Sequence, residues 1–171
     1  MKDSLATRIA IDVHYQDDSA YAAGVLFERW PAEEALDTIR CERHGLAPYE
    51  PGQFYKRELP VIIDLLALLE KPAQTIVIDG YVNLGRDQHA GLGEHLWNAL
   101  RQSTAIIGVA KNRFRDTPSN AALLRGTSTK PLYVSAIGIS LVEAKQAIAA
   151  MHGEHRLPTL LKLADRLCRQ C

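Results

Sequence analysis

The segment Thr75–Asp79 (TIVID) constrains the fold most, because it is a short run of β-branched apolar residues that ends at Gly80. Polar and apolar residues do not alternate along the I-V-I that precedes Asp79, so neither face of the strand is suited to solvent. A strand covered on both faces is typical of a sheet with helices packed on either side. The segment therefore favours an α/β fold with a mixed sheet.

The remaining elements agree with this fold class. Two β-rich runs, residues 8–15 and 20–30, flank a polar break at residues 16–19 and predict a hairpin. The other predicted elements are a strand within 35–43, a loop at 45–52, a helix at 58–70, a helix at 93–102, strands at 105–109 and 130–135, and helices at 141–152 and 157–169. Strands come first and helix–strand alternation follows, which is the order of an α/β domain.

Composition sets limits on size and charge. The 171 residues, 47% of them hydrophobic, suit a single domain over residues 1–171 with a substantial core. Twenty Lys+Arg balance twenty Asp+Glu, so net charge neither attracts nor repels a polyanion. Any nucleic-acid partner must therefore bind a local basic patch.

The chain also lacks the marks of a membrane or secreted protein. No apolar run reaches the roughly 18 residues that span a bilayer, and no secretory signal opens the chain, so we expect a cytoplasmic location. Cys168 and Cys171 form a C-x-x-C, but a zinc site needs two more ligands at suitable spacing. With three cysteines in all, reduced thiols are the expectation.

Three acidic residues lie at positions where burying a carboxylate is costly or where the carboxylate can reach a ligand. Asp12 interrupts an apolar strand, Asp79 closes another, and Glu58 falls at the start of the helix predicted next to the sheet. Carboxylates at the ends of sheet strands point into the crevice where α/β folds bind ligands. The three side chains are therefore predicted to converge.

Converging carboxylates repel one another, and a divalent cation relieves that repulsion. Hard oxygen ligands favour Mg²⁺ or Mn²⁺, and such a site suits hydrolysis of a nucleic-acid phosphodiester. The alternative is structural: Asp79 is a strand-end turn residue beside Gly80, and Glu58 an ordinary acid in the first turn of a helix.

Five separated segments resemble the endonuclease V family, in its chain order. The segment I-D-V-H-Y at 11–15 is similar to the family's V-D-V-x-Y, and Y-E-P-G-Q-F-Y-K-R-E at 49–58 to its Y-[IV]-P-G-F-L-S-F-R-E. I-D-G at 78–80 resembles V-D-G, and I-G-V-A-K at 107–111 matches the family's segment. K-P-L-Y-V-S at 130–135, I-S-L at 139–141, R-L-P at 156–158 and L-A-D at 163–165 resemble its C-terminal block.

This resemblance implies a ribonuclease H-like fold and an enzyme that, with Mg²⁺, nicks DNA or RNA at the second phosphodiester 3′ to a deaminated base such as hypoxanthine. The residues it implies as metal ligands are Asp12, Glu58 and Asp79, with Lys111 near the scissile phosphate. The residues it implies at the substrate are Tyr49, Pro51 and Gly52 as the wedge that replaces the everted base, and Gly80 in the pocket, with Tyr81 beside it.

The chain also departs from the family. After Asp79-Gly80 the family has H-G-x-x-H-P-R-R, whereas this chain continues Y-V-N-L-G-R-D and lacks both histidines. The G-H-R before I-S-L is also missing. A lost general acid–base group can cost on the order of 10²-fold or more in rate. The sequence leaves open whether Tyr81 or His89 takes over, and how strong the activity is.

Several side chains have a second interpretation. Tyr49 is by type alone a surface loop aromatic, and Lys111 with Arg113 and Arg115 a solvated basic run. His14 shares the sheet face of Asp12 and either approaches a metal or hydrogen-bonds to a neighbour.

The competing function is a nucleic-acid- or partner-binding module that keeps the fold and has lost turnover. A relative in fold alone that processes another phosphoester is a third hypothesis.

Overall fold

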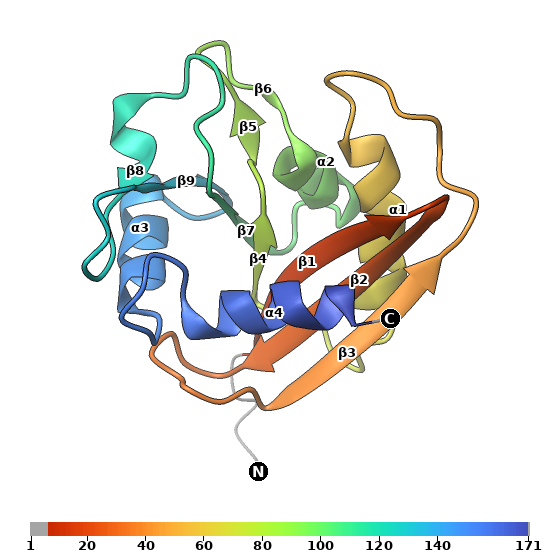
Figure 1. The fold of residues 1–171 in the computed structure, drawn as a ribbon, viewed down its shortest axis with the longest axis horizontal. Helices are drawn as coiled ribbons and strands as arrows, with labels where there is room; N and C mark the ends of the chain where they lie inside the picture. The colour runs from red at the N-terminus through yellow and green to blue at the C-terminus, as the bar shows by residue number, and fades with distance from the viewer. Residues whose placement is uncertain (1–6, 171) are drawn as a thin grey trace.

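Among residues 7–170, which the computed structural model describes, seven strands form one mixed sheet (Figure 1). They are β1 (Arg8–Gln16), β2 (Ser19–Phe27), β3 (Asp37–Arg43), β4 (Thr75–Asp79), β7 (Ala105–Ala110), β8 (Ala122–Leu123) and β9 (Leu132–Ile137). Their order is β3-β2-β1-β4-β7-β9-β8. β4 runs parallel to β1 and to β7, and the other neighbours are antiparallel, which confirms the predicted mixed sheet.

The first two strands form the predicted hairpin. Their register closes with Gln16 opposite Ser19, so only Asp17 and Asp18 lie in the turn. Asp17 has a φ of 56°, a left-handed conformation that Asp and Asn adopt more readily than most residues. The polar break in the sequence is therefore the turn itself.

Helices cover both faces of the sheet in this part of the chain. They are α1 (Tyr55–Leu66), α2 (Leu92–Ala99), α3 (Leu141–Ala150) and α4 (Thr159–Arg169). Ile76 and Ile78 of β4 pack into a buried cluster with residues of α1 and α2, whereas Val77 packs with residues of α3 and α4. The apolar run is thus buried on both sides, as predicted. Among residues 7–170, no helix has both the length and the apolar character that a membrane span requires.

Helix boundaries differ from the predictions by a few residues. α1 begins at Tyr55 rather than at residue 58, because its first turn is polar and exposed in part and so carries no apolar periodicity. It ends at Leu66 because the next amides bond three residues back, Leu68 to Leu65 and Leu69 to Leu66, which tightens the chain out of the α-helix. Glu58 lies in the first turn, as predicted.

Some short elements gave no usable signal in the sequence. They are β5 (Asn83–Leu84) and β6 (His89–Ala90), which pair with each other, the edge strand β8, and the 3₁₀ turn η1 (Ser119–Ala121). Two residues are too few to show the alternation that identifies a strand. The β5–β6 hairpin occupies the segment in which the chain departs from the family pattern.

Gly108 lets the loop after β4 lie directly over β7. A Cβ atom at this position would stand 2.6 Å from the carbonyl oxygen of Gly80, 2.6 Å from Ser135 Oγ and 2.9 Å from the Val82 nitrogen. At Gly24, in β2, the nearest atoms to a Cβ belong to side chains instead: Ile9 Cδ1 at 2.7 Å, Ile39 Cγ1 at 3.1 Å and Leu65 Cδ2 at 3.2 Å. Side chains can rotate away, whereas paired backbone cannot.

We therefore expect Gly108→Ala to lower the free energy of unfolding by about 2 to 3 kcal/mol, and Gly24→Ala by about 1 kcal/mol or less. Urea unfolding of both variants beside the wild-type protein measures the difference. Equal losses at the two positions would contradict the packing of the Gly80–Val82 backbone on β7.

Candidate active site at the carboxyl ends of the parallel strands

Asp12 and Asp79 lie side by side on two parallel strands. The pairing of β1 with β4 places Ile11 opposite Ile78, so each aspartate is the next residue at the same level of the sheet. Both line one hollow together with Lys111, which directly follows β7. The Val13 amide donates to Asp12 Oδ1 at 2.8 Å and holds that carboxyl in place. The topology thus brings together two of the predicted carboxylates and the predicted lysine.

Glu58 lies near Asp79 but outside the hollow that holds Asp12. It lines a neighbouring pocket with Asp79, from the first turn of α1. Burial is the main cause that raises its pKa from 4.5 to about 7; the Tyr15 hydroxyl lowers it and the charge of Asp79 raises it. Tyr15 faces Glu58 closely enough for this effect, although among the described residues its hydroxyl has no partner at ordinary hydrogen-bond geometry. Asp79 therefore lines both hollows, one with Asp12 and the other with Glu58.

Asp165 on α4 is a candidate that the sequence analysis missed. Among residues 7–170, one group of potential metal ligands lies mutually within 4.8 Å, and it comprises Asp12, Asp165 and Cys168 rather than the three predicted carboxylates. A signal was present in the sequence: Leu161, Asp165 and Cys168 follow one another at helical spacing, so a carboxylate falls on the face that packs on the sheet. Cys171, the other half of the C-x-x-C, lies outside the described residues.

Burial and the charge of a neighbouring carboxylate raise the pKa of the two central aspartates. Burial first, and then the charge of Asp79, raise the pKa of Asp12 from 3.8 to about 8, with a further contribution from Asp165; the Val13 amide and Lys111 oppose them. Burial also raises the pKa of Asp79, against the charge of Lys111 and with that of Asp165. In the absence of a cation, the site therefore disfavours ionisation of both aspartates.

Asp165 behaves in the opposite way. Burial would raise its pKa, but the hydrogen bond from Arg169 and the charges of Lys111 and Arg169 outweigh it and lower the pKa. Arg169 Nε lies 2.9 Å from Asp165 Oδ1. His14 Nδ1 is 3.4 Å from Arg169 Nη1, so this histidine contacts a neighbouring side chain, as one of the two interpretations predicted. Asp165 thus remains ionised beside two aspartates that resist ionisation.

This donor set fits a hard divalent cation. Carboxylate oxygens from three different elements face one another, and burial disfavours their simultaneous ionisation unless a positive charge is added. Lys111 supplies part of that charge. A divalent ion held by these oxygens would supply the rest.

A second pocket, of about 710 Å³, opens beside the carboxylates. Its walls include Glu58 and Asp79 on the side of the acidic group, and Gly52, Gly80, Tyr81, Phe54, Leu92 and Phe114 around them. Phe54 and Phe114 are 54% and 44% exposed, an unusual state for phenylalanine that leaves flat apolar surface free at the opening. Such a pocket suits a flat, partly apolar ligand.

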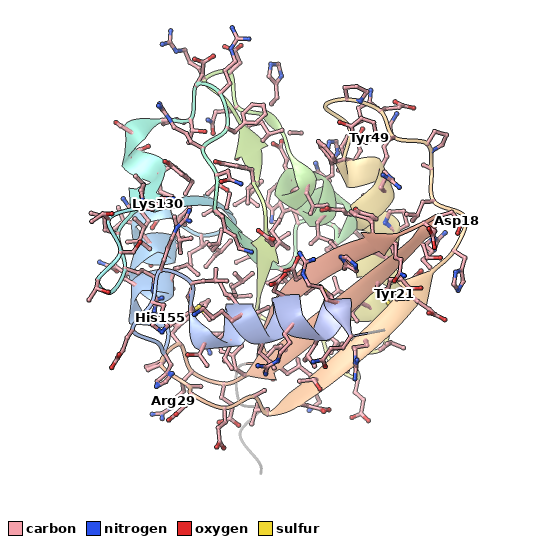
Figure 2. The ribbon with its side chains drawn as sticks, viewed as in Figure 1. Asp18, Tyr21, Arg29, Tyr49, Lys130 and His155 are labelled. Atoms are coloured by element: carbon pink, nitrogen blue, oxygen red, sulfur yellow. The ribbon has the colours of Figure 1, made fainter. Side chains whose placement is uncertain are left out.

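The predicted wedge residues differ in their relation to this pocket. Gly52 lines it, while Tyr49 lies on the loop before α1 (Figure 2), is 56% exposed, and contacts the wall residue Phe54 edge-on at 5.3 Å between ring centroids. Pro51 is exposed in the same loop and is not among the described residues that line the pocket. Gly52 has a φ of 76°, which glycine tolerates and which turns the loop at this point.

His89 lies at the rim of this pocket and not at the carboxylates. It lines the opening from β6, its side chain is 78% exposed, and its Nε2 is 3.8 Å from Asp87 Oδ2. His95 stacks on Tyr55 at 3.6 Å between ring centroids. Neither geometry replaces the two histidines that the sequence lacks after Gly80.

The raised pKa values predict how stability depends on pH without metal. A carboxyl whose pKa is higher in the folded state stabilises the fold below its ordinary pKa, and this contribution is lost as the pH rises through the folded value. With a chelator present, we expect the melting temperature to fall as the pH rises through about 7 for Glu58 and about 8 for Asp12. Asp12→Asn should make this fall smaller, and Asp64→Asn, on the surface, should not. An unchanged pH slope in Asp12→Asn would contradict the burial of that charge.

Comparison with known proteins identifies the family. The family model of endonuclease V matches residues 2–123. Endonuclease V of Pyrococcus horikoshii is 33% identical over 162 residues, which cover 94% of this chain and 72% of the relative. The crystal structure of endonuclease V from Streptomyces avermitilis is 28% identical, with a TM-score of 0.76 over 96% of this chain and 80% of that one.

The fold agrees with more distant structures as well. Endonuclease V of Ciona intestinalis has a TM-score of 0.80 at 21% identity, over 99% of this chain and 87% of that one. These likenesses confirm the ribonuclease H-like α/β fold expected from the sequence. From the matched family model, the relatives and the shared fold, the chain belongs to the endonuclease V family of nucleases.

Proposed function

We propose that the chain is a metal-dependent endonuclease that hydrolyses a phosphodiester near deaminated bases, such as inosine, in DNA or RNA, and so acts in nucleic-acid repair. One observation carries the proposal: a cluster of buried carboxylates, in a member of a nuclease family, adjoins a pocket with exposed aromatic walls. In support, the Ciona intestinalis relative was crystallised with a 24mer DNA that contains an inosine followed by a ribo-adenosine.

Asp12, Asp79 and Glu58 would hold Mg²⁺ or Mn²⁺, and the geometry adds Asp165 to this set. When bound, such an ion supplies an activated water and neutralises charge on the phosphodiester. Arg169 keeps Asp165 ionised and oriented through its hydrogen bond. A cation would stabilise the ionised forms of Asp12 and Asp79, because the pKa of each carboxyl is raised without it.

Lys111 would offset the charge that builds up on the phosphate. It directly follows β7 and lines the same hollow as Asp12 and Asp79. Arg156 donates to the Lys111 carbonyl oxygen and so fixes the backbone from which this ammonium extends. Preorganised positive charge at a developing anion is among the strongest contributions to catalysis.

The aromatic pocket would receive the everted base. Gly80, Tyr81 and Phe114 form its walls beyond Asp79, and Gly52 and Phe54 those nearer α1. The backbone at Gly80, with a φ of 138°, has no atom within 4 Å of a would-be Cβ and leaves room for a base edge. Tyr49 and Pro51 would take the base's former place in the duplex, from the loop that leads into this pocket.

Activity requires the acidic cluster. On labelled strands that contain inosine, with Mn²⁺ or Mg²⁺, we expect the wild-type protein to nick near the inosine and to spare matched strands without it. Asp12→Asn and Asp165→Asn should each lower kcat by about 10²-fold or more, because each removes charge stabilisation at the reacting phosphate.

Asp64→Asn is the control, since Asp64 pairs with Arg43 at 2.7 Å on the surface, where an ion pair contributes little. If the wild-type and Asp12→Asn proteins are equally inert on single-stranded, duplex and RNA substrates, the enzymatic proposal is wrong.

The competing function, a non-catalytic binding module, gains support from the missing histidines. Metal binding separates the two. A preformed carboxylate site stabilises the fold as the ion saturates it, by about 2.7 kcal/mol at a free concentration 100 times Kd. We expect Mn²⁺ to raise the melting temperature of the wild-type protein and to have little effect on Asp79→Asn. A melting temperature independent of Mn²⁺ in the wild-type protein would favour the binding module.

A further inference from the structure

Tyr81 ties two loops of the candidate site together. Its hydroxyl donates to the Asn112 carbonyl oxygen at 2.7 Å and accepts from the Phe114 amide at 3.0 Å. The rings of Tyr81 and Phe114 also meet, at 6.2 Å between centroids and an angle of 60°. One side chain, two residues after β4, therefore holds two residues of the loop after β7, Asn112 and Phe114.

The loop that Tyr81 holds carries a wall of the base pocket. Phe114 lines the 710 Å³ pocket and is 44% exposed, so its position depends on the loop and not on burial in the core. Tyr81 also lines a second hollow of about 390 Å³, between the β5–β6 hairpin and residues 117–121. Tyr81 thus borders both spaces.

Lys111, at the start of this loop, is fixed in another way. Its carbonyl oxygen accepts a hydrogen bond from Arg156, which also donates to the Pro131 carbonyl oxygen at 3.0 Å. Loss of the Tyr81 hydroxyl would therefore release residues 112–114 more than Lys111. The two attachments separate the base pocket from the charge at the phosphate.

We infer that Tyr81 is a positioning residue, whose hydroxyl holds Phe114 in place as a wall of the pocket that accepts the base. The inference rests on the proposed function. It also gives a role to one departure from the family pattern, because the tyrosine stands where that pattern has histidine. A histidine ring is shorter and cannot place a hydroxyl between the Asn112 carbonyl and the Phe114 amide.

Tyr81→Phe tests this role, because it keeps the ring and removes both hydrogen bonds. We expect KM for an inosine-containing strand to rise about tenfold, as the loss of two hydrogen bonds would give, while kcat changes by less than about threefold. Tyr21→Phe is the matched control: Tyr21 lies on β2 (Figure 2), lines a different hollow with Leu167 and Gln170, and should leave both constants unchanged.

Two further measurements distinguish positioning from general stabilisation. If the hydroxyl acts through Phe114, adding Tyr81→Phe to Phe114→Ala should raise KM no further than Phe114→Ala alone. In native-state hydrogen exchange, the Phe114 amide should exchange faster in Tyr81→Phe than in the wild-type protein, and its exchange rate should be unchanged in Tyr21→Phe.

The outcomes keep the two proposals apart. Unchanged exchange at Phe114, or additive effects in the double variant, overturns the role of Tyr81 while the wild-type protein still cleaves inosine-containing strands. A wild-type protein that cleaves none contradicts the proposed function, and exchange at Phe114 then still decides whether the hydroxyl holds the loop.

Discussion

The structure of the site follows from the placement of two aspartates next to each other on parallel strands. Asp12 and Asp79 come one residue after the paired Ile11 and Ile78, so the register of the sheet sets their separation. The pairing therefore holds the two Cα atoms close together at this level of the sheet. Burial and repulsion raise the pKa of both, and the protein keeps this unfavourable arrangement instead of replacing it with apolar residues.

The surrounding side chains compensate for this arrangement in part. Lys111 lowers the pKa of both aspartates, and Arg169 keeps Asp165 ionised close to Asp12. Both cations come from elements next to the central strands, Lys111 after β7 and Arg169 from α4. The compensation is incomplete, since the pKa of Asp12 still reaches about 8. An environment that remains short of positive charge is what a divalent cation site requires.

The pocket beside the carboxylates contains one of the chain's departures from the family pattern. The β5–β6 hairpin replaces the histidine-containing segment, and Tyr81 links that region to residues 112–114 through its hydroxyl. The acidic cluster is independent of this link, because its residues are held by β1, β4, α1 and α4. Under the proposed function, the acidic cluster would serve hydrolysis, and the walls around Tyr81 and Phe114 would serve recognition of the base. A change in one can leave the other in place.

The sequence by itself determined the fold class, the hairpin, the central strand Thr75–Asp79 and the family, because these depend on local apolar patterning and on short motifs. Its apolar patterning also pointed to Asp12, Glu58 and Asp79, and the family resemblance pointed to Lys111. Only the tertiary structure brought Asp165 of α4 next to Asp12 and attached Tyr81 to the Phe114 loop. The first contact joins residues that are 153 positions apart in the sequence, and the second joins residues that are 33 positions apart. Such contacts leave no periodic trace in the chain, because packing of α4 on the sheet and closure of the loop decide them.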